Sequence, residues 1–516
     1  MSKYVACVDA GTSGERCIIY DLKGNSVGEG YYEVSSIYPR NGWAEQDPAY
    51  TLEMAVKAVE TAVADAKVDP ADIAAVSFCT QQTSFAAIDR DGNFLTNVIL
   101  WQDCRGMEAF GWITERLAQA GWTVDDLVRR SGHLMDTMTA GPKAVWVRRN
   151  LPEIYEKTWK FVTPMSMLVK KFGGEDWYDE EGSKSWWMVR DIMTGEFDPE
   201  LLKILDMDAD KYPSFLPSGA VAGHVSDEIA ARTGLKAGTP IIMGATDQIC
   251  AAIGAGNYGT GDIGSLCLGT VGVVLAYADK PVIPDGGMQI VGYPGKGVAL
   301  EAGIAVAATA LRWLRGLLYP EDYSTSGLFD EMLAEAAKSP VGANCVAFIP
   351  HLIGAATPVN DPNVRGAFTG MSLGTTRADL MRACVEGVCF EMRDVLQNCR
   401  KQGIANYRKF RVIGGACRSD FWNQMQADVY NCPVETVTAP EVPSLGLAIV
   451  AAVGAGLIDT MEHACEQMVT VKKRYEPDPE AARLYDEFFA VYQAAIRDMR
   501  RETFPMLAGL RQREGM

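Results

Sequence analysis

Residues 5–21, VACVDAGTSGERCIIYD, predict a strand, a tight polar turn and a second strand. Apolar and β-branched residues flank the turn, as strands favour, and Gly11 and Gly14 supply the backbone freedom that a narrow turn needs. In such a turn several backbone N–H groups and the hydroxyls of Thr12 and Ser13 point into one concavity, which can hold an anion. The stretch is therefore a candidate phosphate site, although an ordinary hairpin with a polar turn has at least equal weight on this evidence alone.

Asp9 stands at the mouth of this turn. A carboxylate repels phosphate unless a metal ion lies between them, so Asp9 beside Gly-Thr-Ser favours a magnesium–nucleotide over free phosphate. A second unit of the same kind, DIGSLCLGTVGVVLAYAD at 262–279, again predicts strand, turn and strand, with its turn at 269–272. The two units together predict two related domains that each present one phosphate-binding turn to a shared cleft.

Length and composition limit the possible classes of protein. A chain of 516 residues is too long for one core, and we expect two domains, over residues 1–252 and 253–516. The net charge of −18 opposes a nucleic-acid or anionic-membrane partner, because both need a basic face. Thirteen scattered cysteines without a C-x-x-C pair, no signal peptide at the start, and no apolar run long enough to span a bilayer predict a cytoplasmic protein.

The order of predicted elements is mixed α/β in both halves. Strands are expected at 27–35, 73–79, 345–350, 410–413 and 434–437, and a hairpin at 85–94. Helices are expected from Asp47-Pro48 onward and over most of 103–171, around 302–318, and at 378–400, 445–454 and 481–503. Polar segments follow three predicted strands, at 80–84, 101–105 and 245–248, where open α/β sheets bind ligands. Asp247 lies in the last of these, although an aspartate in such a position is most often a helix N-cap.

Two motifs point to other classes of function. Residues 254–259 match G-x-G-x-x-G, but a helix precedes and a strand follows, which is the reverse of what a dinucleotide site needs. Residues 370–374 match the elbow of serine hydrolases, with Ser372 as nucleophile and His463 as the only downstream histidine. A serine hydrolase is thus the alternative from a different class. There is no P-loop.

Taken in order, these features resemble the FGGY family of carbohydrate kinases along nearly the whole chain. The segments that carry the resemblance are 9–14 (DAGTSG), 42–48 (GWAEQDP), 101–105 (WQDCR), 142–147 (PKAVWV), 366–371 (GAFTGM) with 379–386, and 414–422 (GGACRSDFW) with Gln424, Ala427 and Asp428. Ala140, Ala144 and Cys384 depart from the two family signatures. Ser372 becomes a spacer residue in the second signature.

The resemblance implies a two-domain actin-like (ribonuclease H-like) ATPase fold with a cleft between the domains. It implies ATP and Mg²⁺, with Asp247 as catalytic base and Asp9 holding the metal ion. The β- and γ-phosphates would be gripped by Thr12, Ser13, Arg16, Gly269 and Thr270, and the α-phosphate and adenosine would lie against Gly414, Gly415 and Ala416. Closure of the cleft would complete the site and exclude water. The resemblance leaves open whether the protein forms a homodimer.

The identity of the sugar is the weakest part of this prediction. The family resemblance suggests substrate contacts from Gln81, Gln82, Thr83, Trp101, Asp103, Met138, Asp247 and Gln248. After the strand-end Gln, glycerol kinases have Arg-Glu and xylulokinases have Met-His, whereas this chain has Gln82-Thr83. Uncharged partners weaken each hydrogen bond to a hydroxyl, which favours an acceptor with more hydroxyls. We therefore expect an open-chain ketopentose such as xylulose, with a glycerol- or erythritol-type polyol kinase as the alternative.

Overall fold

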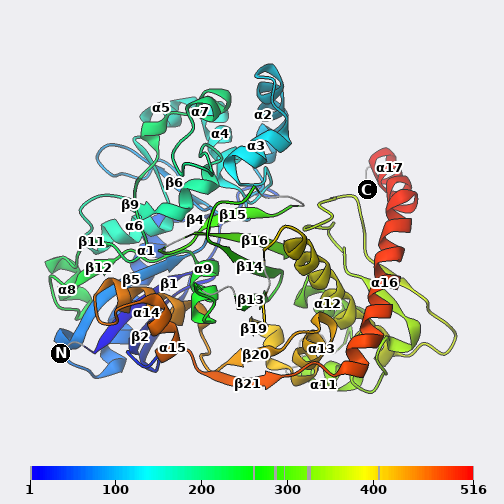
Figure 1. Ribbon diagram of the computed structural model, residues 1–516. Helices are drawn as coiled ribbons and strands as arrows, with labels where there is room; N and C mark the ends of the chain where they lie inside the picture. Colours follow the sequence, from blue (N-terminus) through cyan, green and yellow to red (C-terminus); the bar gives the residue numbers. More distant parts are fainter. Residues whose placement is uncertain are drawn as a thin grey trace.

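The computed structural model describes residues 3–259, 262–283, 287–295, 297–321, 327–404 and 407–514. Two large β-sheets, one from each half of the chain, lie beside each other and carry helices (Figure 1). A group of short segments, cyan to green in Figure 1, stands beyond the first sheet and makes contact with the second. This arrangement confirms the expected α/β fold with two sheet-containing domains.

The first sheet is built around the hairpin that opens the chain. Strand β1 (Tyr4–Ala10) pairs antiparallel with β2 (Gly14–Asp21) and parallel with β5 (Ile73–Thr80), which confirms the predicted strands and turn. Helix α1 (Pro48–Ala66) packs on β2 and β3 and begins as predicted, because the Asp47 carboxylate accepts hydrogen bonds from the first turn. The strand order is β11-β12-β5-β1-β2-β3, and the remaining members are β3 (Ser26–Glu33), β11 (Val221–His224) and β12 (Pro240–Ile242).

Between β5 and β11 the chain leaves the sheet and forms what we call the inserted lobe, residues 81–220. Its buried centre is aromatic: the rings of Phe85 and Phe161 lie 5.3 Å apart and both contact Trp187. The expectation of a mainly helical segment at 103–171 is confirmed, except for the short strand β8 (Lys160–Val162). The other elements of the lobe are β6 (Ala86–Ile88), β7 (Val98–Ile99), α2 (Met107–Gln119), α3 (Val124–Ser131), α4 (Ala140–Asn150), α5 (Pro152–Lys157), α6 (Pro164–Phe172), β9 (Tyr178–Glu180), α7 (Pro199–Leu205) and β10 (Ser214–Leu216).

The second sheet repeats the plan of the first. Strand β13 (Ile263–Leu268) pairs antiparallel with β14 (Gly272–Ala278) and parallel with β19 (Lys409–Ile413), so the second predicted hairpin is confirmed. The order is β15-β16-β14-β13-β19-β20-β21, with β15 (Gln289–Gly292), β16 (Val298–Ile304), β20 (Val434–Val437) and β21 (Val471–Tyr475). The helices of this part are α10 (Ala308–Leu318), α11 (Leu328–Ala336), α12 (Arg377–Lys401), α13 (Asp420–Tyr430), α16 (Pro479–Arg501) and α17 (Thr503–Glu514).

Two helices from the second half of the chain pack on the first sheet. Helix α14 (Val442–Gly454) contacts β1 and β5 and crosses α9 (Asp247–Gly254), while α15 (Met461–Met468) packs beside it. The crossing is a backbone contact, because a Cβ atom on Gly446 would lie 1.8 Å from Cys250 O and one on Gly254 would lie 2.0 Å from Val442 O. The two halves of the chain therefore share one apolar layer.

Two expected boundaries were wrong. Residues 302–304 were expected to be helical but belong to strand β16, which pairs along its length with β14, so this helix starts only at Ala308. The expected closing helix at 481–503 ends at Arg501, and α17 follows it. None of the described helices is long and apolar enough to cross a membrane. Nine of the thirteen cysteines are buried.

Candidate active site

Asp247 lies where the first sheet ends and helix α9 begins. It follows Thr246, whose hydroxyl caps the helix, so Asp247 is not the N-cap that its position suggested. Thr246 forms an isolated parallel bridge with Thr80, which places the ends of β12 and β5 side by side. The residue is half-buried, and burial together with the charge of Asp9 raises the pKa of Asp247 to about 7. A carboxyl group with that pKa can exchange a proton near neutral pH, as a general base must.

Asp9 is the second carboxyl group of the site. It lies near the end of β1, opposite Arg16 of β2. Burial raises the pKa of Asp9 to about 6, and Glu441, just before α14, adds repulsion. Because the charge of Asp9 also raises the pKa of Asp247, the fold has brought these two predicted residues close together.

The described residues contain no cluster of three or more side chains that could hold a metal ion by themselves. Mg²⁺ is commonly bound through one or two carboxylates while the phosphates of a nucleotide and water fill its other positions. The half-buried carboxyl group of Asp9, next to the polar turn at 11–14, fits that kind of donor set.

Glu301 is a third carboxyl group, and the sequence analysis did not identify it. It lies in β16 opposite Gln289 of β15, whose side-chain nitrogen donates to Glu301 Oε1 at 2.8 Å. The other oxygen, Oε2, is buried and makes no close hydrogen bond among the described residues, although the Gln82 side chain lies near enough to lower the pKa of this carboxyl group. The charge of Glu301 raises the pKa of Asp247, so Glu301 of the second sheet lies near Asp247 at the end of the first. An acceptor atom without a partner beside a candidate base is available to a hydroxyl of a substrate.

Thr12 connects the phosphate turn to the expected sugar side through a closed set of hydrogen bonds. Its hydroxyl accepts from Trp101 Nε1 at 2.8 Å and donates to Gln81 Oε1 at 3.1 Å. Gln81 donates to Gln46 Oε1, and Gln46 in turn donates to the Thr12 carbonyl at 2.8 Å. The hydroxyl proton of Thr12 is thus already used in the hydrogen bond to Gln81. The same contacts hold Trp101 and Gln81 against the turn. Gln46 was not expected here, because its role depends on a contact with a residue 34 positions away.

Ser13 and Arg16 are the other predicted phosphate ligands at the first turn. Ser13 is exposed, and its carbonyl accepts from Val34 N. Arg16 contacts Glu29 closely, lies 3.6 Å from Glu441 and stacks on Tyr31. Arg16 therefore stands at the turn, as expected, but with carboxylate partners that an incoming phosphate would have to replace.

The second turn lies beside the expected adenosine segment. Gly414 has a φ of 90°, and a Cβ atom there would lie 2.7 Å from Leu268 O, directly before Gly269. A Cβ atom on Gly269 or Gly415 would meet nothing within 4 Å, so both positions border open space. Thr270 is exposed, and its carbonyl fixes the start of α10 by accepting from Ala307 N. Ala416 is buried in the short helix Gly415–Arg418.

Of four other predicted sugar contacts, Gln82 and Gln248 lie beside Asp247. Gln82 donates to Thr246 Oγ1 at 3.2 Å, and the buried Thr83 holds a left-handed φ of 54°, a conformation that is strained for Thr and is often found at functional sites. Gln248 donates its backbone N–H to Asp247 Oδ1, and its side chain lines a small enclosed space against the second sheet. Met138 is exposed, and its backbone is fixed by Asp136.

Asp103 differs from these residues because its carboxylate has no exposed surface. It accepts from Ala44 N at 2.7 Å and from both the backbone and the guanidinium group of Arg105. Lys143 lies nearby, and its buried ammonium group donates to Leu100 O and Trp101 O. Burial lowers the pKa of Lys143 to about 7. These groups support the Trp101 segment from behind, so Asp103 can act on a substrate only through the position of that segment.

The two motifs that pointed to other classes of function, at 254–259 and 370–374, have ordinary structural roles. Residues 254–259 connect helix α9 to strand β13, in the order that excludes a dinucleotide-binding turn. Ser372 is exposed, and its hydroxyl accepts a hydrogen bond from Gly374 N. Among the described residues its hydroxyl has no histidine partner, and His463 pairs instead with Asp459. The described geometry therefore gives no support to a serine hydrolase.

Comparison with family models accounts for most of the chain. Residues 4–254 match the N-terminal domain, and residues 264–455 match the C-terminal domain, of the FGGY family of carbohydrate kinases.

Individual relatives agree with this match. A xylulose kinase of Bacillus subtilis is 28% identical over 95% of this chain and 96% of its own length. A glycerol kinase of Thermococcus gammatolerans is 31% identical over 92% of this chain and 94% of its own length. The solved structure of a xylulose kinase from Lactobacillus acidophilus superposes with a TM-score of 0.87, at 23% identity, over 98% of this chain and all of the other.

Proposed function

The chain belongs to the FGGY family of carbohydrate kinases, and from this premise we propose that it transfers the γ-phosphoryl group of ATP to a hydroxyl of an open-chain ketopentose such as xylulose. The observation that carries the proposal is the position of Asp247, a half-buried carboxyl group with a pKa of about 7, between Asp9 and Glu301. Two turns, at 11–14 and 269–272, connect hairpin strands that belong to different sheets.

In the proposed reaction Asp247 accepts the proton of the attacking hydroxyl. The hydroxyl oxygen forms a bond to the γ-phosphorus as the bond to the β-γ bridging oxygen breaks, and ADP leaves. Little covalent work falls to the protein, so the rate depends on alignment and on neutralising the phosphate charge. Alignment of the acceptor would come from Gln82, Gln248 and the unpaired oxygen of Glu301.

The phosphates would lie between the two turns. Backbone N–H groups of the turns and the side chains of Ser13, Arg16 and Thr270 would hold the β- and γ-phosphates, while Gly414, Gly415 and Ala416 would border the α-phosphate and adenosine. Thr12 would act mainly through its backbone, since its hydroxyl already holds Trp101 and Gln81 in place. Asp9 would hold Mg²⁺, which when bound neutralises charge on the phosphates.

The choice of sugar follows from the neutral groups of the acceptor side. Gln82 and Thr83 offer amide and hydroxyl groups, and Met138 offers a flexible apolar wall. Each neutral hydrogen bond contributes about 0.5–1.5 kcal/mol, against about 1.5–3 kcal/mol for one with a charged partner. A five-carbon chain brings enough hydroxyls to use Gln82, Gln248 and Glu301 together. Glycerol or erythritol is the second candidate, supported by the glycerol-kinase-like pair Asp247-Gln248.

A coupled assay of ADP release tests the proposal with D-xylulose, L-xylulose, ribulose, erythritol and glycerol at fixed ATP and Mg²⁺. We expect the highest kcat/KM for one of the ketopentoses. A value for glycerol that is about tenfold higher than for any pentulose, or about 1.4 kcal/mol in transition-state binding, would replace the pentulose with the polyol. Absence of phosphorylation across a wider panel of sugars would contradict the kinase mechanism itself.

A further inference from the structure

A cavity of about 170 Å³ lies where the inserted lobe meets the hairpin between β15 and β16. Residues that match the N-terminal family domain line one side, and residues 292–295, 297 and 298, which match the C-terminal family domain, line the other. The two walls touch at Gly182 and Gly292, where a Cβ atom on Gly292 would lie 2.2 Å from Gly182 Cα. The residues that carry the argument are Glu180, Gly182, Arg190, Ser218 and Gly292.

The cavity contains a buried arginine that lacks a partner. Arg190 is only 8% exposed, and within the described part of the chain its guanidinium group makes no hydrogen bond or ion pair. Its Nε is fully buried, and burial lowers the pKa of the group. An unpaired buried charge costs several kcal/mol, which a pairing ligand would offset.

The acidic residues near Arg190 are committed elsewhere. Glu181 and Glu196 are exposed and lie 3.5 Å and 3.9 Å from Lys184 Nζ. Asp191 lies 3.1 Å from Arg130. None of them is within ion-pair distance of Arg190, so the cavity itself contains one buried cation and the carboxyl group of Glu180.

Glu180 is readily protonated. Burial raises the pKa of Glu180 to about 7, with additional repulsion from Asp179 and Glu181, while hydrogen bonds from Gly182 N and Ser218 lower it. Ser218 Oγ donates to Glu180 Oε1 at 3.2 Å. On the opposite wall the only ionisable group that lines the cavity in the described chain is Tyr293, and its hydroxyl donates to Asn257 O. A protonated Glu180 would leave the charge of Arg190 unopposed.

We propose that this cavity binds a small oxyanion, of the size of phosphate or a short carboxylate, between the guanidinium group of Arg190 and the protonated carboxyl group of Glu180. Arg190 donates to the anion, and the Glu180 acid donates its proton in a second hydrogen bond. One proton is therefore taken up with each anion whenever Glu180 is ionised beforehand. One wall belongs to the N-terminal family domain and the other to the C-terminal family domain. A bound anion therefore stabilises the arrangement in which the two walls touch.

This site is separate from the active site. Gly292 pairs with Val298, whereas Gln289 pairs with Glu301, three residues further along the hairpin, which is about 10 Å along a strand. No residue of either phosphate turn lines the cavity.

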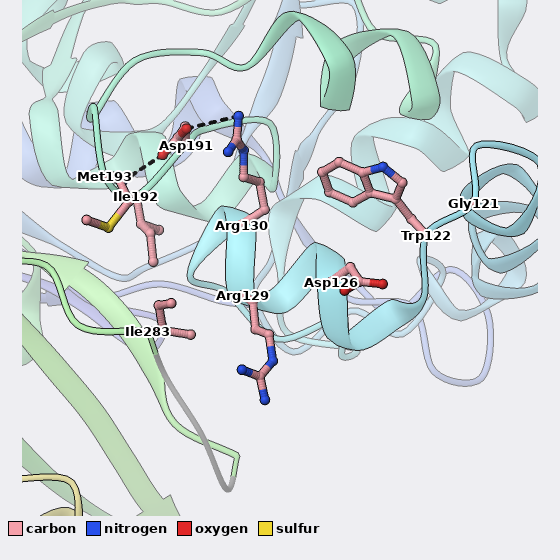
Figure 2. A pocket seen from close by; sticks show the side chains of 9 residues that line it. All are labelled: Gly121, Trp122, Asp126, Arg129, Arg130, Asp191, Ile192, Met193 and Ile283. Carbon is pink, nitrogen blue, oxygen red and sulfur yellow. Dashed lines mark hydrogen bonds and ion pairs between the residues drawn. The ribbon is translucent and has the colours of Figure 1, made fainter.

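A larger hollow of about 420 Å³, lined by the inserted lobe and by Ile283, lacks these features (Figure 2). The arginine that projects into it beside Asp191, Arg130, lies 2.6 Å from Asp198 and 3.1 Å from Asp191. Its charge is thus already neutralised by two carboxylates. The smaller cavity is the one whose chemistry calls for a ligand.

Sulfate is a suitable probe because its charge stays constant between pH 6 and 8. Calorimetry on the full chain, at constant ionic strength and with a saturating non-hydrolysable ATP analogue and Mg²⁺ on the phosphate turns, should give one sulfate per chain. Arg190→Met should weaken binding at least tenfold, whereas Arg497→Met, a change at an exposed arginine on α16, should leave it unchanged. Acetate in place of sulfate distinguishes a planar carboxylate from a tetrahedral ion as the preferred class.

Two further measurements test the chemistry. At pH 8, titrations in buffers of different ionisation enthalpy should show close to one proton taken up per sulfate by the native protein and none by Glu180→Gln. Without sulfate, Arg190→Met should melt at the same temperature as the native protein or higher, because it removes an unpaired buried charge. Equal sulfate binding by native protein and Arg190→Met, or a large loss of stability in that variant without sulfate, would overturn the proposal. If Arg190→Met does not fold, unchanged proton uptake in Glu180→Gln would overturn it instead.

Discussion

Glu301 raises the pKa of Asp247 although Glu301 lies in the second sheet and Asp247 begins helix α9 at the end of the first. Their interaction means that the second sheet, through β16, adjusts the basicity of a group carried by the first. Any rotation of one domain against the other would change the separation of these charges. The proton affinity of the proposed base is therefore coupled to the relative position of the domains.

Asp247→Asn should lower kcat by about 10²–10⁴-fold, because the amide cannot accept the proton of the sugar hydroxyl. Affinity for ATP, measured by calorimetry, should change little. The matched control is Asp227→Asn, which changes an exposed aspartate at the same place in a helix, directly after the capping Ser226 of α8 (Asp227–Thr233). Normal turnover by Asp247→Asn would remove this residue from the mechanism.

The same variant should be more stable than the native protein at alkaline pH. The pKa of Asp247 in the folded protein, about 7, lies above its ordinary value of 3.8, so folding disfavours the ionised form. That penalty is present above pH 7 and disappears as the pH falls towards 4. Thermal melting should therefore show a higher Tm for Asp247→Asn at pH 8, with each kcal/mol worth about 1 °C in a chain of this length, and no gain at pH 4. A gain that is independent of pH would contradict the assigned pKa.

In the native enzyme kcat/KM should rise with pH through about 7. Asp247 acts as a base only when it is ionised, and below about pH 6 the protonation of Asp9 should steepen the loss. The measurement is a pH profile of kcat/KM between 5.5 and 9 in buffers of constant ionic strength. A flat profile down to pH 5.5 would mean that the base has an ordinary carboxyl pKa.

Glu301→Gln should move that profile to lower pH, because it removes a negative charge that raises the pKa of Asp247. It should also raise KM for the sugar, since it replaces the unpaired acceptor oxygen with an amide. Glu480→Gln, at an exposed position in the first turn of α16, is the control and should change neither quantity. A shift in KM with an unmoved pH profile would limit Glu301 to binding.

Trp101→Phe should lower kcat/KM for both substrates by about two- to tenfold, the value of one hydrogen bond. The indole N–H that fixes the Thr12 hydroxyl would be lost, and with it the link between the turn and Gln81. Steady-state kinetics with ATP and with sugar varied separately measure both effects. Trp313→Phe, on the surface of α10, serves as control. An effect confined to the sugar would show that the hydrogen-bonded set does not reach the phosphates.

Gly446→Ala should destabilise the protein by roughly 1–3 kcal/mol, the usual cost of overpacking. The new Cβ atom would lie 1.8 Å from Cys250 O, so α14 and α9 would have to separate. Gly111→Ala, in helix α2 with nothing within 4 Å of its Cβ, should be neutral or slightly stabilising. Denaturant unfolding of both variants makes the comparison, and equal stabilities would show that the helix crossing is adaptable.

The parts of the site that were predicted are those encoded by neighbouring residues. The turn at 11–14 and the strand end before Asp247 have local signals in glycine, hydroxyl and apolar pattern, and the structure has both elements where they were expected. Glu301 was missed because its strand, 298–304, was partly interpreted as helix, which hid the face that it occupies. Asp103 follows a strand end as a substrate ligand would, yet its burial depends on Ala44, 59 residues earlier in the chain. Such contacts depend on the assembled fold, which a pattern of single residues does not contain.

The crossing of α14 over α9 determines whether the two halves of the chain can be produced as separate fragments. A fragment that ends near residue 252 would contain β1 and β5 but not α14, and so would expose to water the apolar layer made of residues such as Val5, Ala75 and Ile249. The two fragments produced separately should therefore aggregate, and production together should restore a soluble pair by fragment complementation. The two halves of this enzyme repeat one structural plan, but because they share an apolar layer we expect them to fold as a single unit.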